Sequence, residues 1–120
     1  MKNLKYIILL FFLTIFYQTC FAQTLIRKGS SVNGTVIYNF DKKTKYVREG
    51  ISSFGNIKYY VDKNFIRIGS TNYGQIKYNI TLPFIREGAS SYGKIIYYFD
   101  GVYVRKGSNK YGEIIYRINN

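Results

Sequence analysis

Apolar residues occupy every second position, with mixed residues between them, in five stretches of the chain that each begin two residues after a glycine. The apolar positions of the five stretches are Val36, Tyr38 and Phe40; Ile57, Tyr59 and Val61; Ile76, Tyr78 and Ile80; Ile95, Tyr97 and Phe99; and Ile114, Tyr116 and Ile118. A period of two places these side chains on one face of a β-strand. We therefore predict five strands whose shared apolar face forms the core.

A shorter apolar segment that ends in Arg-x-Gly precedes each of these strands. These segments begin five internal repeats, at Ile26, Val47, Ile66, Ile85 and Val104. The aliphatic residue of each segment is predicted to face the core, whereas the arginine and the aromatic residue before it share the opposite face. Each repeat of about 19 residues is therefore predicted to form one β-hairpin.

Turn-forming residues separate the predicted strands. Asn33-Gly34 and Asp100-Gly101 are expected at turns because glycine accepts a positive φ without steric cost. Asp41 and Asp62 occupy the same site between repeats, which favours turn formation over catalysis by these carboxylates. The serine-rich segments between the two glycines of each repeat are expected on one rim, where they cap turns or, alternatively, hold a sugar or a phosphate.

Ten short strands rich in Ile and Tyr would leave aggregation-prone edges in an open sheet. The chain begins with a short strand and ends with a long one, so the last repeat can pair with the first. We predict an all-β fold in which the five hairpin repeats are arranged radially as a closed flower or shallow barrel. An open solenoid is the alternative.

The repeated form Ile-Arg-x-Gly-Ser-Ser-x-Tyr-Gly-x-Ile-x-Tyr-x-Phe-Asp-Gly resembles that of the small bacterial β-flower proteins. This resemblance covers all five repeats and implies hairpins arranged around a hydrophobic centre. It implies no particular activity. The Tyr-Gly-x-Ile-x-Tyr-x-Phe-Asp-Gly portion is also similar, more weakly, to the membrane-associated MORN repeats, which form open ribbons.

The first 22 residues have the features of a secretory signal peptide. Lys2 and Lys5 precede an apolar run over residues 7–16, and Cys20-Phe21-Ala22 provides small residues at a cleavage site after Ala22. We predict a signal peptide at 1–22, a repeat domain at 23–120, and an exported protein that is periplasmic, attached to the cell surface or secreted. An uncleaved anchor and a lipid-modified Cys20 are the alternatives.

The composition disfavours most catalytic chemistry. The chain has no histidine, and its single cysteine lies within the predicted signal peptide. Ser-His and Cys-His arrangements and thiolate metal ligands are therefore absent from the repeat domain. Glu49 and Glu87 hold equivalent positions, and a ring can bring two such carboxylates near one another, as paired-carboxylate chemistry would require. We expect a protein that is not an enzyme and that uses no cofactor or metal.

The candidate ligand-binding residues are an arginine in every repeat and the aromatic residues that precede four of them: Arg27, Arg48, Arg67, Arg86 and Arg105, with Tyr46, Phe65, Phe84 and Tyr103. Arginine binds carboxylate, sulfate or phosphate in bidentate fashion and stacks on aromatic rings. In the alternative, each arginine packs on its aromatic neighbour and pairs with a turn aspartate, and its repetition favours this structural role.

A formal net charge of +12 favours anionic partners and also aids solubility. We therefore predict an exported, non-enzymatic module that binds an anionic envelope or extracellular polymer. Acidic polysaccharide, lipid head groups or another envelope protein are the expected partners, and nucleic acid is less favoured. The alternatives are a structural or protein-interaction repeat protein and a module associated with the membrane surface.

Overall fold

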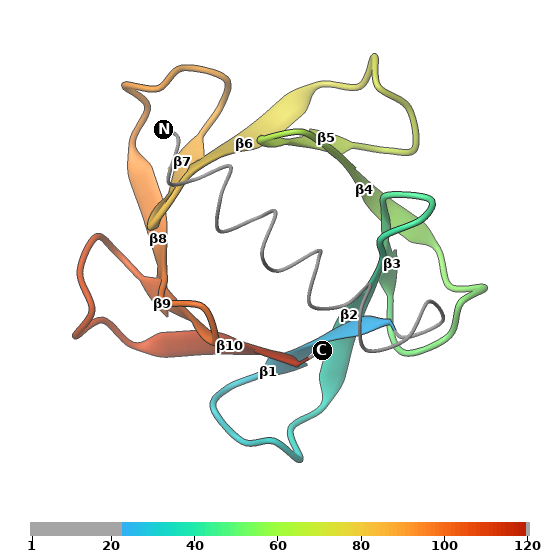
Figure 1. Ribbon diagram of the computed structural model, residues 1–120, viewed down its shortest axis with the longest axis horizontal. Coiled ribbons are helices and arrows are strands. Elements are labelled where there is room, and N and C mark those ends of the chain that lie inside the picture. Colours follow the sequence, from blue (N-terminus) through green and yellow to red (C-terminus); the bar gives the residue numbers. More distant parts are fainter. Residues whose placement is uncertain (1–22, 120) are drawn as a thin grey trace.

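The computed structural model describes residues 23–119, which form ten antiparallel strands in a closed barrel (Figure 1). The predicted signal peptide lies outside the described residues. The strands are β1 (Thr24–Lys28), β2 (Val36–Asp41), β3 (Tyr46–Glu49), β4 (Ile57–Asp62), β5 (Phe65–Ile68), β6 (Ile76–Thr81), β7 (Phe84–Glu87), β8 (Ile95–Phe99), β9 (Tyr103–Lys106) and β10 (Ile114–Asn119). The prediction of five hairpins is confirmed.

The first and last strands close the ring. Strand β1 pairs with its hairpin partner β2 on one side and with β10 on the other, where Ile26 lies opposite Ile118. Next to this pairing, the Gly29 N–H donates to the carbonyl of Ile115 at 2.8 Å. Every strand of the barrel therefore has two neighbours, and closure removes the unpaired edges of an open solenoid.

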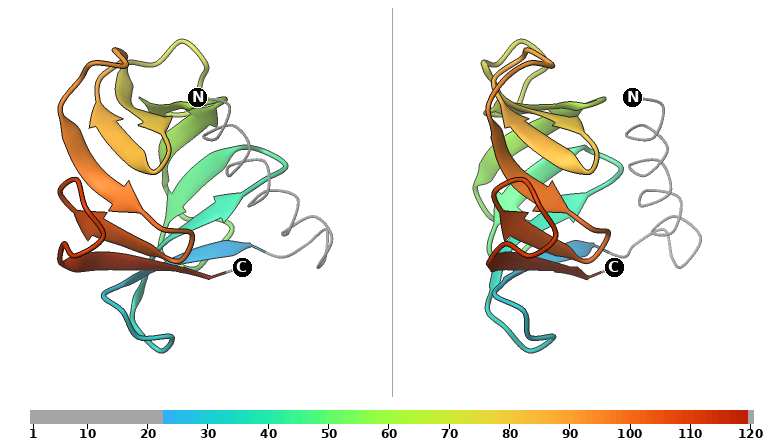
Figure 2. Two further views of the ribbon diagram at one scale, coloured as in Figure 1. Left: turned by 60° about the vertical axis from the view of Figure 1, so that its left-hand side comes forward. Right: turned by 90° about the vertical axis from the view of Figure 1, so that its left-hand side faces the viewer.

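The two ends of the barrel differ. Within each repeat, a long loop joins the short strand to the long strand, and all five of these loops lie at the end that we call the loop end (Figure 2). The tight turns between repeats lie at the opposite end, which we call the turn end. The loops splay outward around the ring (Figure 1), and the Cα positions span 34 × 34 × 25 Å.

The interior is filled by the repeat-initial residues and by the second and third predicted apolar positions of each long strand. The first position corrects the prediction, because it lies opposite the repeat arginine and therefore shares the outer face of that arginine. The residues concerned are Val36, Ile57, Ile76, Ile95 and Ile114.

The aliphatic residues that begin the repeats all line the interior near the turn end, together with the last apolar residue of each long strand. Across the hairpin, each repeat-initial residue lies opposite a tyrosine of its own long strand. Ile26 lies opposite Tyr38, and Val47 lies opposite Tyr59. Opposed residues share a face of the sheet, so these tyrosines also point inward.

Each long strand contains a β-bulge that the alternating pattern does not predict. In the first repeat, Ile26 lies opposite Tyr38 and Arg27 opposite Val36, so Ile37 is the additional residue. The equivalent residues in the other repeats are Lys58, Lys77, Ile96 and Ile115. A bulge bends its strand and increases the local twist. The repeated bulges therefore account for the outward splay of the loops.

The two glycines of a repeat serve different purposes, which corrects the prediction for Gly34. The positive φ belongs to the first glycine, such as Gly29 at 79°, rather than to the second. At Gly34, a Cβ would lie 2.5 Å from the carbonyl oxygen of Lys28, so the second glycine is required for space. Gly101 has a φ of 103°, as the Asp100-Gly101 pair predicts.

Candidate binding site at the loop end

All five repeat arginines hold the loops of their own hairpins. In each repeat, Nη1 of the arginine donates to the carbonyl oxygen of the second glycine: Arg27 to Gly34 at 2.7 Å, Arg48 to Gly55 at 2.8 Å, Arg67 to Gly74 at 2.9 Å, Arg86 to Gly93 at 2.9 Å and Arg105 to Gly112 at 3.1 Å. A charged donor makes such a bond stronger than a neutral one. Each arginine therefore fixes the end of its loop.

The same guanidinium groups lie over the aromatic residues that precede them. The separations from ring centroids are 5.3 Å for Arg48 over Tyr46, 5.7 Å for Arg67 over Phe65, 5.5 Å for Arg86 over Phe84 and 5.6 Å for Arg105 over Tyr103. This geometry is that of a cation–π contact. The predicted placement of arginine and aromatic residue on one outer face is confirmed, while their binding of a ligand stays a prediction.

Two of the turn aspartates pair with these arginines. Nε of Arg67 lies 3.2 Å from Asp62, and Nε of Arg105 lies 3.6 Å from Asp100. Burial alone would raise the pKa of Asp100, but backbone N–H donors at Tyr103 and Val102 and the charge of Arg105 together lower it below its usual value. The contacts expected of a structural arginine are thus present.

The polar residue at the start of each loop tip caps a turn. Its side-chain oxygen accepts a hydrogen bond from the backbone N–H two residues later: Ser31 from Asn33, Ser52 from Phe54, Thr71 from Tyr73, Ser90 from Tyr92 and Asn109 from Tyr111. This is the geometry of the local turns that Ser, Thr and Asn favour. The capping role predicted for the serine-rich segments is confirmed at these positions.

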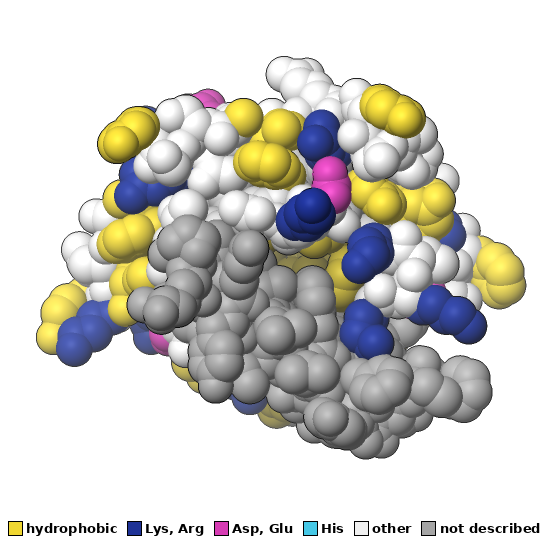
Figure 3. Space-filling model, turned by 45° about the horizontal axis from the view of Figure 1, so that its top comes forward, with side chains coloured by type: hydrophobic (Ala, Val, Ile, Leu, Met, Phe, Trp, Pro, Cys, Tyr) yellow, Lys and Arg dark blue, Asp and Glu magenta, His cyan; other side chains and the backbone are white. Residues whose placement is uncertain are grey.

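Four of the loops present an aromatic side chain to solvent at the residue before the second glycine. The exposed fractions are 92% for Phe54, 90% for Tyr73, 93% for Tyr92 and 82% for Tyr111. Hydrophobic side chains project at several points of the molecular outline, with Lys and Arg side chains nearby (Figure 3). Nζ of Lys110 lies 5.5 Å from the ring centroid of Tyr111. We call these four residues the tip aromatics.

A ring of tyrosines, one from each long strand, lies inside the barrel between the loops and the apolar interior. Its members are Tyr38, Tyr59, Tyr78, Tyr97 and Tyr116, and the measured centroid separations between neighbours are 6.2 Å for Tyr38–Tyr59, 6.4 Å for Tyr38–Tyr116 and 6.1 Å for Tyr78–Tyr97. These pairs are edge-on, the arrangement that aromatic quadrupoles prefer. The tyrosine ring therefore contains two groups of rings in contact, Tyr59–Tyr38–Tyr116 and Tyr78–Tyr97.

Burial raises the pKa of three members of the tyrosine ring. It is the largest cause at Tyr59, Tyr78 and Tyr116, and the neighbouring tyrosines raise each pKa further. A phenolate is disfavoured because it would lose hydration and would repel other phenolates nearby. These hydroxyl groups therefore stay protonated at neutral pH, and those of Tyr59 and Tyr78 hydrogen-bond to the neighbouring tyrosines Tyr38 and Tyr97.

The residue between arginine and glycine in each repeat faces the tyrosine ring from the neighbouring strand. The opposed pairs are Lys28 with Tyr116, Glu49 with Tyr38, Ile68 with Tyr59, Glu87 with Tyr78 and Lys106 with Tyr97. All five residues are exposed. Glu49 and Glu87 are separated by the repeat that carries Ile68, so they are not neighbours in the ring.

Two bulged lysines add positive charge near the tyrosine ring. Nζ of Lys58 lies 3.9 Å from Glu49, and Nζ of Lys77 lies 5.4 Å from the ring centroid of Tyr78. The alternating pattern alone would place these lysines on the face opposite the tyrosines, and the bulge changes the direction of their side chains. Their positions in the repeat, directly before the tyrosine, are the only signal in the sequence.

Two buried asparagines form hydrogen bonds to the loops of neighbouring repeats, and the sequence analysis did not predict this role. Nδ2 of Asn39 donates to the carbonyls of Gly50 at 2.8 Å and Ser52 at 3.1 Å. Nδ2 of Asn79 makes the equivalent bonds to Gly88 and Ser90, both at 2.9 Å, so each asparagine holds the loop of the repeat that follows its own. Asn39 is 0% exposed and Asn79 is 2% exposed. The equivalent residues in the other repeats are Tyr60, Tyr98 and Arg117. The change of residue type at this position is the one sign in the sequence that the asparagines have a special role.

Over residues 23–119, no three His, Cys, Asp or Glu side chains come together as metal ligands would. In the same part of the chain, no helix has the length and apolarity that a membrane span requires.

A family model described as "6-fold beta flower protein" matches residues 26–120. The match includes all five repeats. Comparisons with curated proteins and with solved structures give no match.

Proposed function

Since the chain belongs to the 6-fold beta flower protein family, we propose that it is an exported, non-enzymatic repeat module that binds an anionic polymer of the cell envelope or the extracellular space. The observation that carries this proposal is the loop end, where four almost fully exposed aromatic side chains stand on separate loops. Exposed aromatic groups held by a rigid scaffold are more typical of binding than of folding.

The charge of the loop end suits an anionic partner. Six lysines lie at this end of the barrel: Lys28, Lys58, Lys77, Lys94, Lys106 and Lys110. The same end carries three glutamates, Glu49, Glu87 and Glu113, so positively charged side chains outnumber negatively charged ones there. Tyrosine rings can stack on sugar rings while lysines attract carboxylate or sulfate groups. We place the binding surface on the tip aromatics and these lysines.

The arginines are less suited to this role than the sequence suggests. Each guanidinium group already donates to a loop carbonyl, and four of them stack on an aromatic residue of the barrel wall. Binding a polymer through them would require the loss of contacts that hold the loops. We therefore infer that they support the tip aromatics rather than replace them.

A chromatography experiment tests the proposal. Removing all four tip aromatics, as F54S, Y73S, Y92S and Y111S in one chain, keeps the net charge and removes the stacking surface. We expect this variant to elute from heparin beads at lower salt than the unchanged protein. The control is Val102→Ser, which removes an apolar side chain that is 40% exposed at the turn end. A lysine-rich protein of equal charge is run for comparison. If it and the other three proteins all elute at the same salt concentration, the proposal is contradicted.

A protein-interaction role is the second candidate, and it rests on two further exposed apolar residues of the loops. Val32 is 54% exposed and Ile51 is 63% exposed, and both lie beside the capped turns. Apolar residues gathered at one end also suit contact with another protein. Sedimentation at high concentration tests self-association through this end, which the four-residue serine variant should abolish.

Attachment to a membrane surface uses the same groups, because aromatic residues and lysines are favoured at the membrane–water interface. Pelleting with liposomes separates this role from polymer binding. Binding that requires anionic lipid and is absent on heparin would replace the polymer by lipid head groups as the partner.

A further inference from the structure

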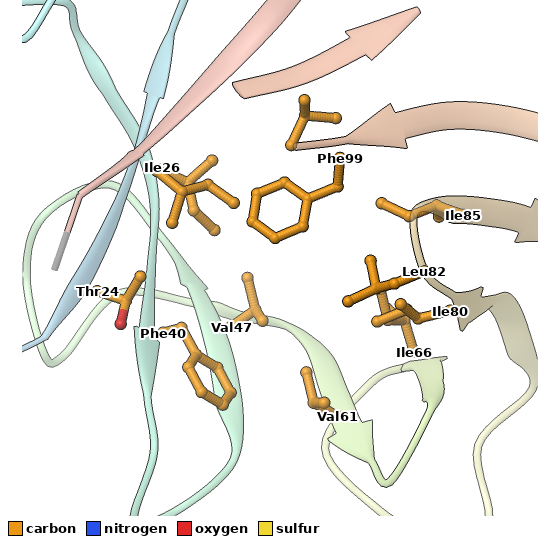
Figure 4. Close-up of a pocket in the computed structure, with 12 residues that line it drawn as sticks. Thr24, Ile26, Phe40, Val47, Val61, Ile66, Ile80, Leu82, Ile85 and Phe99 are labelled. Carbon is orange, nitrogen blue, oxygen red and sulfur yellow. The ribbon is translucent and has the colours of Figure 1, made fainter. Parts of the chain in front are cut away.

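Clefts with charged walls open between neighbouring hairpins at the loop end. One cleft, of about 440 Å³, lies between the fourth and fifth hairpins, and another, of about 370 Å³, lies between the second and third. Ligand sites in proteins usually have volumes of about 300–1,000 Å³. The apolar pocket at the turn end differs, because its described lining residues, such as Val47, Val61 and Leu82, include no charged side chain (Figure 4). An anion is therefore bound more readily in a cleft than in that pocket.

Lysines stand on both sides of the cleft between the fourth and fifth hairpins. Lys94 comes from the fourth hairpin and Lys106 from the fifth, and both side chains are exposed. Half-buried Ile96 and Ile115 form part of an apolar wall. A Cβ built at Gly107 would meet no atom within 4 Å, so this glycine keeps the cleft open. The cleft therefore combines an apolar wall with two cations.

The carboxylate of Glu113 also lines this cleft, which we call the Glu113 cleft. The N–H of Lys106 donates to the carbonyl of Glu113 at 2.8 Å, so these two residues lie opposite each other. Across residues 23–119, however, the side chains of Lys94, Lys106 and Glu113 form no ion pair, cation–π contact or hydrogen bond. All three charged groups are thus available to a ligand.

The equivalent cleft between the second and third hairpins has different charged groups. Its lysines are Lys58 and Lys77, and the described residues that line it include no carboxylate. Nζ of Lys58 lies 3.9 Å from Glu49, and Nζ of Lys77 lies 5.4 Å from the ring centroid of Tyr78. Both ammonium groups therefore already have a partner in the protein, which leaves the Glu113 cleft better suited to an anion.

Two lysines and one glutamate indicate which kind of anion fits the Glu113 cleft. The lysines can hold a carboxylate, whereas Glu113 accepts hydrogen bonds and repels additional negative charge. A polyphosphate has no hydroxyl groups along its chain and would place dense negative charge beside Glu113. A sugar acid offers one carboxylate, several hydroxyl donors and an apolar ring face that can pack on Tyr97. Only the sugar acid suits all three charged groups.

We propose that the Glu113 cleft binds one acidic sugar residue, of the chemical class of a uronic acid, within the polymer that the loop end binds. This inference rests on the proposed function and gives it a specific site. The carboxylate of the sugar lies between Lys94 and Lys106, and its hydroxyl groups donate to Glu113. The neighbouring sugar residues then reach Tyr92 and Tyr111, the tip aromatics of the same two hairpins.

NMR titration of the protein produced from its full sequence with trigalacturonate tests the site directly. The N–H of Gly107 is the reporter, because it donates to the carbonyl of Ile96, another residue of the cleft, at 2.9 Å. Its signal should shift more than that of Gly69, which holds the same position in the equivalent cleft. Galactotriose, a neutral trisaccharide, should bind at least about tenfold more weakly. Equal shifts at the two glycines, or equal affinities for the two trisaccharides, overturn the proposal.

The double variant Lys94→Gln with Lys106→Gln removes both cations of the cleft. We expect its affinity for trigalacturonate to fall at least about tenfold, with an unchanged urea midpoint because both side chains are exposed. Lys43→Gln with Lys45→Gln removes the same charge from exposed positions at the turn end and is the control. Equal losses of affinity in the two double variants would show general charge attraction alone and would overturn the assignment.

The variant Glu113→Gln distinguishes a sugar acid from other polyanions. The amide is a weaker acceptor for hydroxyl groups and no longer repels phosphate. The ratio of the affinities for trigalacturonate and tripolyphosphate should therefore fall at least about fivefold. An unchanged ratio overturns the choice of a sugar acid.

Failure of this site is distinguishable from failure of the proposed function. If the four-residue serine variant elutes early from heparin but trigalacturonate does not shift Gly107, the site is overturned and polymer binding at the loop end stands. If the unchanged protein binds neither heparin nor trigalacturonate, both proposals are overturned.

Discussion

Arg86 connects three parts of its repeat. Its Nη1 donates to Gly93 in the loop at 2.9 Å, its Nε donates to Thr81 of the preceding strand at 3.1 Å, and its guanidinium lies over Phe84. Hydrogen bonds from charged donors contribute about 1.5–3 kcal/mol each, and truncation leaves the carbonyl acceptor unpaired. The arginine position is therefore expected to control hairpin stability.

The substitution Arg86→Met retains the apolar stem and removes the guanidinium group. We expect the free energy of unfolding to fall by about 1.5–3 kcal/mol, because both hydrogen bonds and the cation–π contact are lost. Urea unfolding measures the change. Lys94→Met, at an exposed lysine of the same loop, is the control. Equal midpoints for the two variants would contradict the structural role of the arginine.

The tyrosine ring predicts a stability loss at alkaline pH. Burial raises the pKa of Tyr78 above its ordinary value of 10.0, so the phenol ionises more easily in the unfolded chain than in the barrel. Its contribution to stability is present in full below pH 10 and is lost as the pH rises from there toward the folded pKa.

Tyr78→Phe should reduce this alkaline loss. Urea midpoints measured between about pH 8 and pH 11 should fall less steeply for the variant than for the unchanged protein. Tyr92→Phe removes a phenol that is 93% exposed and should leave the slope unaltered. If the urea midpoint of the Tyr78→Phe protein falls more steeply with pH than that of the unchanged protein, ionisation of Tyr78 does not cause the alkaline loss of stability.

Residue types in the repeat predicted the inward-facing side chains beyond the β-bulge of each long strand, but neither the outward-facing residue before the bulge nor the hydrogen bonds. The alternation of Tyr59 and Val61 identifies a core face directly. The bond from Arg67 to the Gly74 carbonyl depends on how the loop folds back over its strand, which the alternation does not specify. For the same reason, the exposed tip aromatics were not recognised as candidates from the sequence.

At the scale of the element, each hairpin depends on contacts with the next hairpin. Asn79 belongs to β6, yet both of its donor bonds reach the loop that follows β7, at Gly88 and Ser90. In the following repeat the equivalent residue is Tyr98, which instead packs edge-on against Phe84. Tyr98 and Phe84 lie within one hairpin, so this position links adjacent repeats through Asn79 but not through the contact of Tyr98.

Asn79→Ala should loosen one loop more than the others. We expect a loss of about 2 kcal/mol in the free energy of unfolding and faster hydrogen exchange at the loop amides around Gly93, because the carbonyls of Gly88 and Ser90 lose their donor. Asn72→Ala, at an exposed loop position, is the control. Uniformly unchanged exchange in the loop would mean that Asn79 does not hold it in place.

The β-bulges show why the shape of the hairpin was less predictable than its existence. A bulge depends on the partner strand as well as on the bulged one, because two residues must oppose a single residue. Lys58 and Ile96 occupy equivalent bulges although one is charged and the other aliphatic, so composition gives no consistent signal. The number of strands and their order, by contrast, followed from counting the repeats.

At the scale of the whole molecule, closure makes every repeat necessary. Strand β9 pairs with β8 and β10, and β10 pairs with β1. Deleting residues 103–119 would therefore leave β8 and β1 with free edges and would open the apolar interior. Exposed edges rich in aliphatic and aromatic residues promote association between chains.

We expect the deletion of residues 103–119 to yield a protein that aggregates and lacks a cooperative thermal transition. A circular permutant is the matched control: it joins the present ends by a short linker and opens the loop between β5 and β6, so that all ten strands are kept. The permutant should remain monomeric in sedimentation and should melt cooperatively. A deletion variant that melts like the unchanged protein would contradict the closed ring.

The pairing of β1 with β10 also constrains how such a protein can gain or lose length. Both contacts of every strand are antiparallel, so strand directions must alternate all the way around the circle. An odd number of strands would bring two strands of like direction together at the seam. Evolutionary change in circumference therefore has to proceed by complete hairpins. A five-hairpin member in a family described as six-fold differs by one such unit, the smallest step that alternation permits.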